Sequence, residues 1–158
     1  MIGDERHFSD ELGNFWEDAG GSRMAGRVLG ALLLAEPREM SSSELATLLG
    51  ISAASVSTAT RELIRPGLVR RVRVPGRRED HFVATMGANM TGFITSRLAL
   101  AQRWMELMLR GEELAEGKDP AIRDQLVEIR SFYEFLAEEQ AGMLARWEQR
   151  QRERRRPA

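Results

Sequence analysis

The sequence predicts a mainly α-helical fold with one small β-hairpin, and two observations support this fold class. Apolar residues recur at helical spacing along most of the 158-residue chain. Residues 68–74 instead mix β-branched residues with arginines, and a Pro-Gly turn separates them from a second short segment at residues 81–85. The chain has no cysteine, so neither disulfides nor zinc–thiolate sites hold the fold together. At 158 residues it can bury a core of ordinary size, so it needs no such cross-link.

Two helices are expected before residue 37. Residues 8–19 repeat large apolar residues at helical spacing, and Gly20-Gly21-Ser22 ends this amphipathic helix. Residues 23–35 are almost all apolar after Arg27 and stop before Pro37, which is typical of a helix buried on most sides. We expect this second helix to form the centre of the core.

The next segment predicts two short helices separated by a tight turn. Ser41 stands three residues before Glu44, the reciprocal capping arrangement that starts a helix, and Gly50 ends that helix. Ser52 is placed to cap a second helix over residues 53–65. Its expected inward stripe consists of Val56, Ala59 or Thr60, and Leu63. Two short helices in this arrangement form a helix-turn-helix.

A hairpin follows these helices. Val72 and Val74 alternate with Arg71 and Arg73, which indicates a strand over residues 68–74, and residues 81–85 are expected to be the returning strand. Pro75-Gly76 opens the turn between them. The hairpin is the wing of a winged helix-turn-helix domain that we place at residues 23–87.

Two long helices are predicted at the C-terminus. The first runs from about residue 88 to 116 and ends at Gly117 and the Asp119-Pro120 pair. The second carries a heptad seam with one polar member: Ile122, Leu126, Ile129, Tyr133, Leu136, Gln140, Met143 and Trp147. Because a seam this long needs a partner helix, we expect residues 88–151 and the N-terminal segment 1–22 to dimerise. Residues 152–158 are expected to be a frayed basic tail.

The expected dimer interface takes its residues from both ends of the chain. They are Phe8, Leu12, Phe15, Trp16, Ile129, Tyr133, Leu136, Met143 and Trp147. The sequence therefore predicts a winged helix-turn-helix flanked by N- and C-terminal dimerisation helices.

Charge is distributed very unevenly along the chain. Residues 61–78 hold seven arginines and one acid, a local charge of +6, although the whole chain has a net charge of −1. The remaining residues therefore carry −7. Such a separation gives one attractive face for phosphate, while the acidic remainder repels DNA and disfavours wrong orientations. The alternative interpretation is an ordinary solvated, arginine-rich hairpin.

Several functional classes find no support in the sequence. No nucleophile with a base, pair of carboxylates or phosphate-binding loop appears in credible context, so we expect neither catalysis nor a cofactor. His7 and His81, the two histidines, are far apart in sequence, so no metal site is expected. The first twenty residues hold six acids and no continuous apolar run, which argues against an export signal or membrane span and for a cytoplasmic protein.

The segment from Glu44 to Ala84 carries a family resemblance. Its sequence, ELATLLGISAASVSTATRELIRPGLVRRVRVPGRREDHFVA, resembles the MarR superfamily of bacterial transcription regulators, in particular the GbsR-like branch. The likeness extends over nearly the whole chain. It implies a homodimeric repressor, joined by its terminal helices, that presents two recognition helices to a palindromic operator. It also implies an effector pocket where the long helices meet the winged lobe, although the sequence identifies no effector.

The expected DNA contacts lie on the second helix of the helix-turn-helix and on the wing. Small side chains near the start of the recognition helix permit close approach to base edges: Ser52, Ala54, Ser55, Ser57 and Thr58. Arg61, one turn further on, is the candidate for guanine or phosphate. Arg77 and Arg78 at the wing tip are expected in the minor groove or on phosphate, with Arg71 and Arg73 on the DNA backbone.

The recognition helix departs from the strongest pattern of base readout, since only alanines and small side chains precede Arg61. This weakens the expectation of sequence specificity more than that of DNA binding. The competing hypothesis is a winged-helix module that binds another protein and has no operator. The arginine content favours DNA, and a steep dependence of binding on salt would separate the two.

Overall fold

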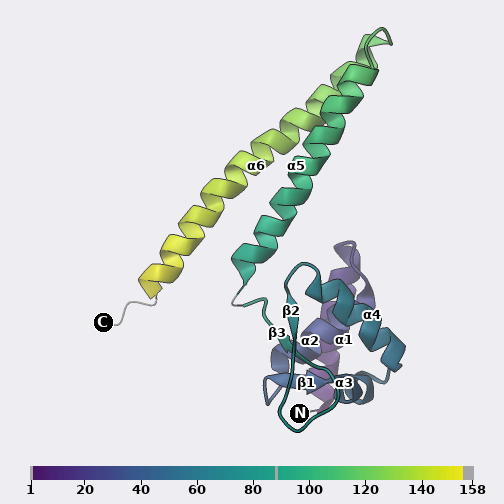
Figure 1. Cartoon of the computed structure of the whole chain (residues 1–158), viewed down its shortest axis with the longest axis vertical. Coiled ribbons are helices and arrows are strands. Elements are labelled where there is room, and N and C mark those ends of the chain that lie inside the picture. The colour runs from purple at the N-terminus through teal and green to yellow at the C-terminus, as the bar shows by residue number, and fades with distance from the viewer. Residues whose placement is uncertain (1, 88, 155–158) are drawn as a thin grey trace. The chain divides into compact units, whose positions relative to one another are not determined.

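The computed structural model describes residues 2–87 and 89–154. Its elements are α1 (Ile2–Asp18), α2 (Arg23–Leu34), β1 (Glu39–Ser41), α3 (Ser42–Leu49), α4 (Ala53–Ile64), β2 (Val69–Val72), β3 (His81–Ala84), α5 (Met90–Leu114) and α6 (Pro120–Arg154) (Figure 1). The chain divides into an N-terminal unit that ends at Phe93 and a C-terminal unit that begins at Ile94. Each unit has its own packing.

The N-terminal unit contains a three-stranded antiparallel sheet in the order β1-β3-β2. The predicted hairpin is present as β2 and β3, where Val72 pairs with His81 and Val69 with Ala84. Strand β1 was not predicted. It is only three residues long, ends at Ser41, which caps α3, and pairs Met40 with Phe82 of the central strand. Its partner strand lies about forty residues further along the chain, and three residues are too few to show the alternation that would predict a strand.

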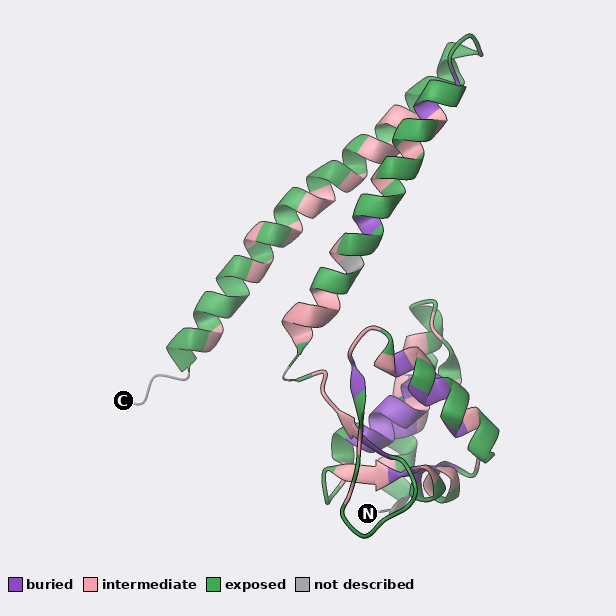
Figure 2. Ribbon diagram, viewed as in Figure 1, coloured by how far each residue is buried: buried purple, intermediate pink, exposed green. Residues whose placement is uncertain are grey.

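The core of this unit is built around α2, as predicted. Figure 2 shows buried residues gathered along α2 and the elements packed against it. The inward stripe of α4 is also confirmed, since both Ala59 and Thr60 are buried beside Val56 and Leu63. The core consists of Ala25, Val28, Leu29, Ala31, Leu32, Leu45, Leu49, Val56, Ala59, Leu63, Leu68, Val69 and Phe82.

Helices α1 and α2 pack unusually closely because small residues line their crossing. A side chain on Gly26 would meet the Leu12 carbonyl oxygen at 2.6 Å and the Gly13 Cα at 2.8 Å. Arg27 of α2 secures the crossing: its Nε donates to Asp10 at 2.6 Å and its Nη2 to the Leu49 carbonyl oxygen at 3.0 Å. One arginine thereby joins α1, α2 and the end of α3.

The apolar face predicted for α1 is divided between two environments. Leu12 and Trp16 pack against the core of their own unit. Phe8 and Phe15 remain exposed, Phe15 with 64% of its surface accessible. Half of this face thus packs within the same chain, whereas Phe8 and Phe15 leave the other half open, and the predicted role of the face in a dimer stays a prediction.

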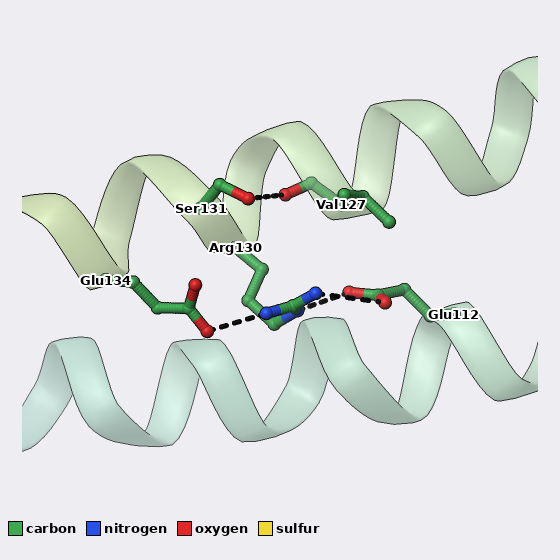
Figure 3. Close-up of polar contacts among 5 residues, drawn as sticks. All are labelled: Glu112, Val127, Arg130, Ser131 and Glu134. Atoms are coloured by element: carbon green, nitrogen blue, oxygen red, sulfur yellow. Dashed lines mark hydrogen bonds and ion pairs between the residues drawn. The ribbon is translucent and has the colours of Figure 1, made fainter.

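In the C-terminal unit, α5 and α6 form an antiparallel helical hairpin. Near their connection, Arg130 of α6 lies between Glu112 of α5 and Glu134 of its own helix, with Nε and Nη1 each 2.6 Å from a carboxylate oxygen (Figure 3). Bonding to Glu112, and then to Glu134, raises the pKa of Arg130. Tyr133 meets Trp104 of α5 with ring centroids 6.1 Å apart. Tyr133, expected at the dimer seam, thus has a partner within the chain.

Helix α6 has no buried residue along its 35 residues, all of which are described. Figure 1 shows α5 and α6 diverging from their connection. Large apolar side chains remain exposed on α6: Ile122, Phe132, Phe135, Met143 and Trp147. The helix continues to Arg154, so residues 152–154 are helical rather than frayed, while the rest of the predicted tail lies outside the described residues.

None of the helices described in the chain is both long and apolar enough to traverse a lipid bilayer.

Candidate nucleic-acid interface

The turn between α3 and α4 sets where the recognition helix begins. Gly50 has a φ of 63° and its N–H donates to carbonyl oxygens of the last turn of α3. This left-handed conformation favours glycine and directs the chain into α4. Ser52 then caps α4, because its Oγ accepts from the Ser55 N–H at 3.1 Å. The predicted cap is confirmed, and it fixes the first turn of the helix.

One face of α4 is open to solvent. Ala54, Ser57, Thr58 and Arg61 are exposed at spacings of three and four residues. Ser52 is also exposed, whereas Ser55 is half-buried and its Oγ lies 2.9 Å from that of Ser52. Arg61 extends back along the helix, with Nη2 at 3.5 Å from the Ser57 Oγ. The face is therefore small and hydroxyl-rich toward the helix start and cationic one turn later.

The wing brings the remaining predicted cations to the surface. Arg73, Arg77 and Arg78 are exposed. Arg71 is also exposed, but its Nη1 pairs with Asp80 at 3.2 Å and its guanidinium lies 6.0 Å from the centre of the Phe82 ring. A phosphate would have to compete with Asp80 for Arg71, so the wing-tip arginines are the freer pair.

The wing tip is attached to the start of α3. Ser43 Oγ donates to Glu79 at 2.8 Å, and the Ser42 N–H donates to the Asp80 carbonyl oxygen at 3.1 Å. His81 is buried, with Nδ1 at 3.1 Å from the Glu79 carbonyl oxygen, which makes it a packing residue. Helix α3 thus contacts the wing at its first turn and leads into the recognition helix at its last.

The cap of α3 is a complete capping box. Ser41 Oγ accepts from the Glu44 N–H at 3.1 Å, and the Ser41 N–H donates to the Glu44 carboxylate at 2.7 Å. This backbone hydrogen bond is the main reason that the pKa of Glu44 is lowered, with smaller contributions from His81 and Arg77. The capping prediction from sequence is confirmed.

Arg6 is a cation near this surface that sequence reasoning did not single out. Its Nη2 lies 3.2 Å from the position of a side chain on Gly50, at the turn before the recognition helix. It also lines an open groove beside α3 with Ser43, Thr47 and Leu48. No spacing in the sequence could place Arg6 there, because the contact depends on how α1 crosses the rest of the unit.

Comparisons with known proteins show which family the chain resembles. A model of the MarR family matches residues 20–78, and a model of the MmpR5-like MarR family transcriptional regulators matches residues 89–151. The HTH-type transcriptional regulator MmpR5 of Mycobacterium tuberculosis is 31% identical over 147 residues, covering 93% of this chain and 88% of that protein. The chain belongs to the MarR family of transcriptional regulators.

The fold agrees with this membership. A crystal structure of a transcriptional regulator superposes on this MarR-family chain with a TM-score of 0.82 at 30% identity, over 92% of this chain and 99% of that one. MarR-family proteins are DNA-binding regulators rather than enzymes, and this membership favours DNA binding over the protein-binding alternative. These comparisons do not confirm the narrower GbsR-like assignment, whereas an MmpR5-like model matches the long helices.

Proposed function

We propose that this MarR-family protein is a sequence-specific repressor that binds a palindromic operator as a homodimer. The outward face of α4 carries the proposal: Ala54, Ser57 and Thr58 are small enough for close approach to base edges, and Arg61 extends beyond them. A thymine methyl can pack on the alanine or threonine methyl, and a guanine can bind Arg61. A protein seated in this way over a promoter excludes polymerase and so represses.

The exposed apolar surface of the C-terminal unit supports the homodimer. Exposed aromatic residues recur along α6, and α5 exposes Leu100 and Trp104 toward solvent. Apolar surface repeated along two long helices is typical of an interface that a partner covers. A second copy offers the same helices, and two-fold pairing is the commonest way to bury them. The dimer would present two recognition helices to half-sites about 10 base pairs apart.

The affinity of such a dimer depends on salt. If each subunit neutralises about four phosphates, the logarithm of the binding constant falls with the logarithm of salt concentration at a slope of about −7. A monomer would neutralise about half as many phosphates and bind far more weakly. A shallow slope would instead indicate contacts that release few counterions.

The first experiment selects an operator from random duplexes with the wild-type protein and titrates it by fluorescence anisotropy at two salt concentrations. The variant Arg77→Ala/Arg78→Ala should bind all duplexes more weakly and show a smaller salt slope, because it removes two expected phosphate contacts per subunit. The matched control is Arg110→Ala/Arg123→Ala, which removes the same charge from exposed positions near the α5–α6 connection. The control should bind as wild type does.

The outcomes separate the parts of the proposal. A selected palindrome with the expected salt slope supports a dimeric, sequence-specific regulator. Binding that is tight for every duplex would contradict sequence specificity, and equal losses in both double variants would contradict a role for the wing. A promoter fusion carrying the selected palindrome then tests repression, which an increase in transcription would contradict.

The family resemblance adds regulation by an effector. A small molecule would release the operator by changing the spacing of the two recognition helices, because both half-sites must be contacted together for full affinity. An effector would therefore weaken operator binding far more than binding to generic DNA. A compound that lowers both equally acts as a simple competitor and would contradict this mode.

A further inference from the structure

Glu62 is an acidic residue at a position where two local effects disfavour a negative charge. It is the single acid among residues 61–78, where seven arginines form the expected phosphate-binding segment. It also lies in the last turn of α4, where the helix dipole favours cations over anions. A negative charge here repels both the helix end and an approaching phosphate. A residue that breaks two local rules needs a compensating tertiary contact.

The Glu62 carboxylate finds this contact at the start of α2. One oxygen accepts from the Ser22 N–H at 3.0 Å, and the other accepts from the Ser22 Oγ at 2.7 Å. The first turn of α2 contains no acid of its own. Glu62 therefore supplies, from forty residues away, the negative charge that the α2 N-terminus favours. Hydrogen bonds to a charged group are among the stronger ones in proteins.

Ser22 is a firm anchor for this contact. Its Oγ also accepts from the Ala25 N–H at 3.1 Å and so caps α2. The preceding turn is covered by Trp16, whose indole occupies the space where a side chain on Gly21 would lie. The Gly21 N–H further donates to the Trp16 carbonyl oxygen at 2.9 Å. The anchor thus belongs to the rigid crossing of α1 and α2.

Apolar packing sets the orientation of α4 less sharply than the two hydrogen bonds between Glu62 and Ser22 do. Val56, Ala59 and Leu63 hold the helix against the core, but burial of apolar surface is non-directional and tolerates small rotations. Two hydrogen bonds near the C-terminal end resist both rotation and sliding along the axis. Arg61, the neighbouring residue, is on the outward face and would move with any such change.

We propose that Glu62 is a positioning residue for DNA recognition: by holding the last turn of α4 on the N-terminus of α2, it sets how the recognition face meets the bases. Glu62 itself contacts no base. The inference rests on the proposed sequence-specific binding, because orientation matters only where base edges are read. Generic binding to phosphates tolerates a small tilt of the helix, whereas base readout does not.

The test compares Glu62→Gln and Glu62→Ala with wild type on two duplexes, the selected operator and a generic sequence. Loss of a negative charge by itself should tighten binding to both duplexes equally. Positioning predicts the opposite for the operator: its affinity falls about tenfold in Glu62→Ala while generic affinity is unchanged or rises. Glu62→Gln, which keeps one acceptor, should show a smaller loss. Glu17→Gln on α1 is the charge-matched control.

Two further measurements complete the test. Thermal melting establishes that each variant is folded at the titration temperature, and hydrogen exchange at the Ser22 amide reports loss of the contact directly. If Glu62→Ala does not fold, Glu62→Gln decides. Equal tightening on both duplexes, or a lower melting temperature with unchanged discrimination, would overturn the proposal. If the wild-type protein prefers no operator over generic DNA, the proposed function is overturned together with this inference. That result comes from the operator selection, before any variant is made.

Discussion

Arg61 is the side chain of the recognition face with the longest reach. In the free protein its Nη2 is 3.5 Å from the Ser57 Oγ, a long and weak contact that DNA can replace. The residues before it on the same face are small, so base readout by a charged group depends on this one position. A guanidinium can donate two hydrogen bonds to a guanine, which an ammonium group cannot match in geometry.

Replacing Arg61 therefore separates charge from geometry. We expect Arg61→Ala to weaken operator binding by about 1–3 kcal/mol and to relax the preference at one base position. Arg61→Lys should keep most of the generic affinity but lose much of the discrimination. Anisotropy titrations against the operator and its single-base variants measure both effects. Unchanged discrimination in the lysine variant would assign Arg61 to phosphate instead.

Glu44 makes the stability of the helix-turn-helix depend on pH. Because the Ser41 N–H and Oγ lower the pKa of Glu44, its carboxylate form stabilises the fold. This stabilisation is complete above the ordinary pKa of 4.5 and is lost as the pH falls through the lowered value in the folded protein. The cap of α3 should therefore weaken in acid and not in base.

The corresponding prediction concerns Glu44→Gln. This variant should melt at a lower temperature than wild type at neutral pH, and the difference should shrink as the pH falls below the ordinary pKa of the carboxylate. Melting curves recorded from neutral to acidic pH give the comparison, with Glu36→Gln as a control at an exposed acid. A difference that stays constant across this pH range would contradict the capping role.

At the scale of elements, the α1–α2 crossing depends on glycines, which have no side chain to hold the two helices apart. A side chain at Gly26 or Gly30 would meet backbone atoms of α1, so the two helices approach more closely than larger residues allow. Backbone cannot move aside as the end of a flexible side chain can. The crossing also carries Arg27 and the Ser22 anchor, so its geometry reaches both α3 and α4.

A single methyl group tests this crossing. Gly26→Ala should destabilise the protein by about 1–3 kcal/mol through overpacking, even though alanine favours helix by about 1 kcal/mol over glycine. Gly3→Ala is the control, because a side chain there meets no other atom within 4 Å. Urea unfolding gives both values. A Gly26→Ala variant as stable as wild type would mean that α1 can shift on α2 without loss.

At the scale of the whole molecule, the C-terminal unit leaves much apolar surface uncovered. Phe132 and Phe135 are each 59% exposed, on either side of the half-buried Tyr133 that contacts Trp104. The surface offered to a partner therefore includes residues next to the predicted heptad seam as well as Met143 and Trp147 at its end. Covering such surface is the main free-energy gain of a helical dimer.

We expect Phe132→Glu/Phe135→Glu to be monomeric, because four glutamates per dimer would be brought into an apolar interface. Light scattering after size exclusion gives the mass, and operator affinity should fall with it. Ala121→Glu/Gln125→Glu adds the same charge to exposed positions of α6 and should remain dimeric. A dimeric Phe132→Glu/Phe135→Glu variant would place the interface elsewhere.

The sequence by itself determined the order of the helices, the hairpin and the local caps. Ser41 with Glu44, Gly50 and Ser52 act on neighbours within four residues, so their roles are visible in the spacing alone. Periodicity likewise identified α2 as the core helix and the outward face of α4. These features follow from interactions that repeat along one segment, which is why a single chain reveals them.

Only the tertiary structure decided which neighbour covers each surface. Periodicity marks a face of α1 as apolar, but it does not distinguish Trp16, which packs against the core, from Phe15, which stays exposed. The pairing of Glu62 with Ser22 joins residues forty positions apart, and the place of Arg6 beside Gly50 depends on a helix crossing. Such contacts join segments that are remote in sequence, and no local spacing encodes them because they exist only once the helices have packed.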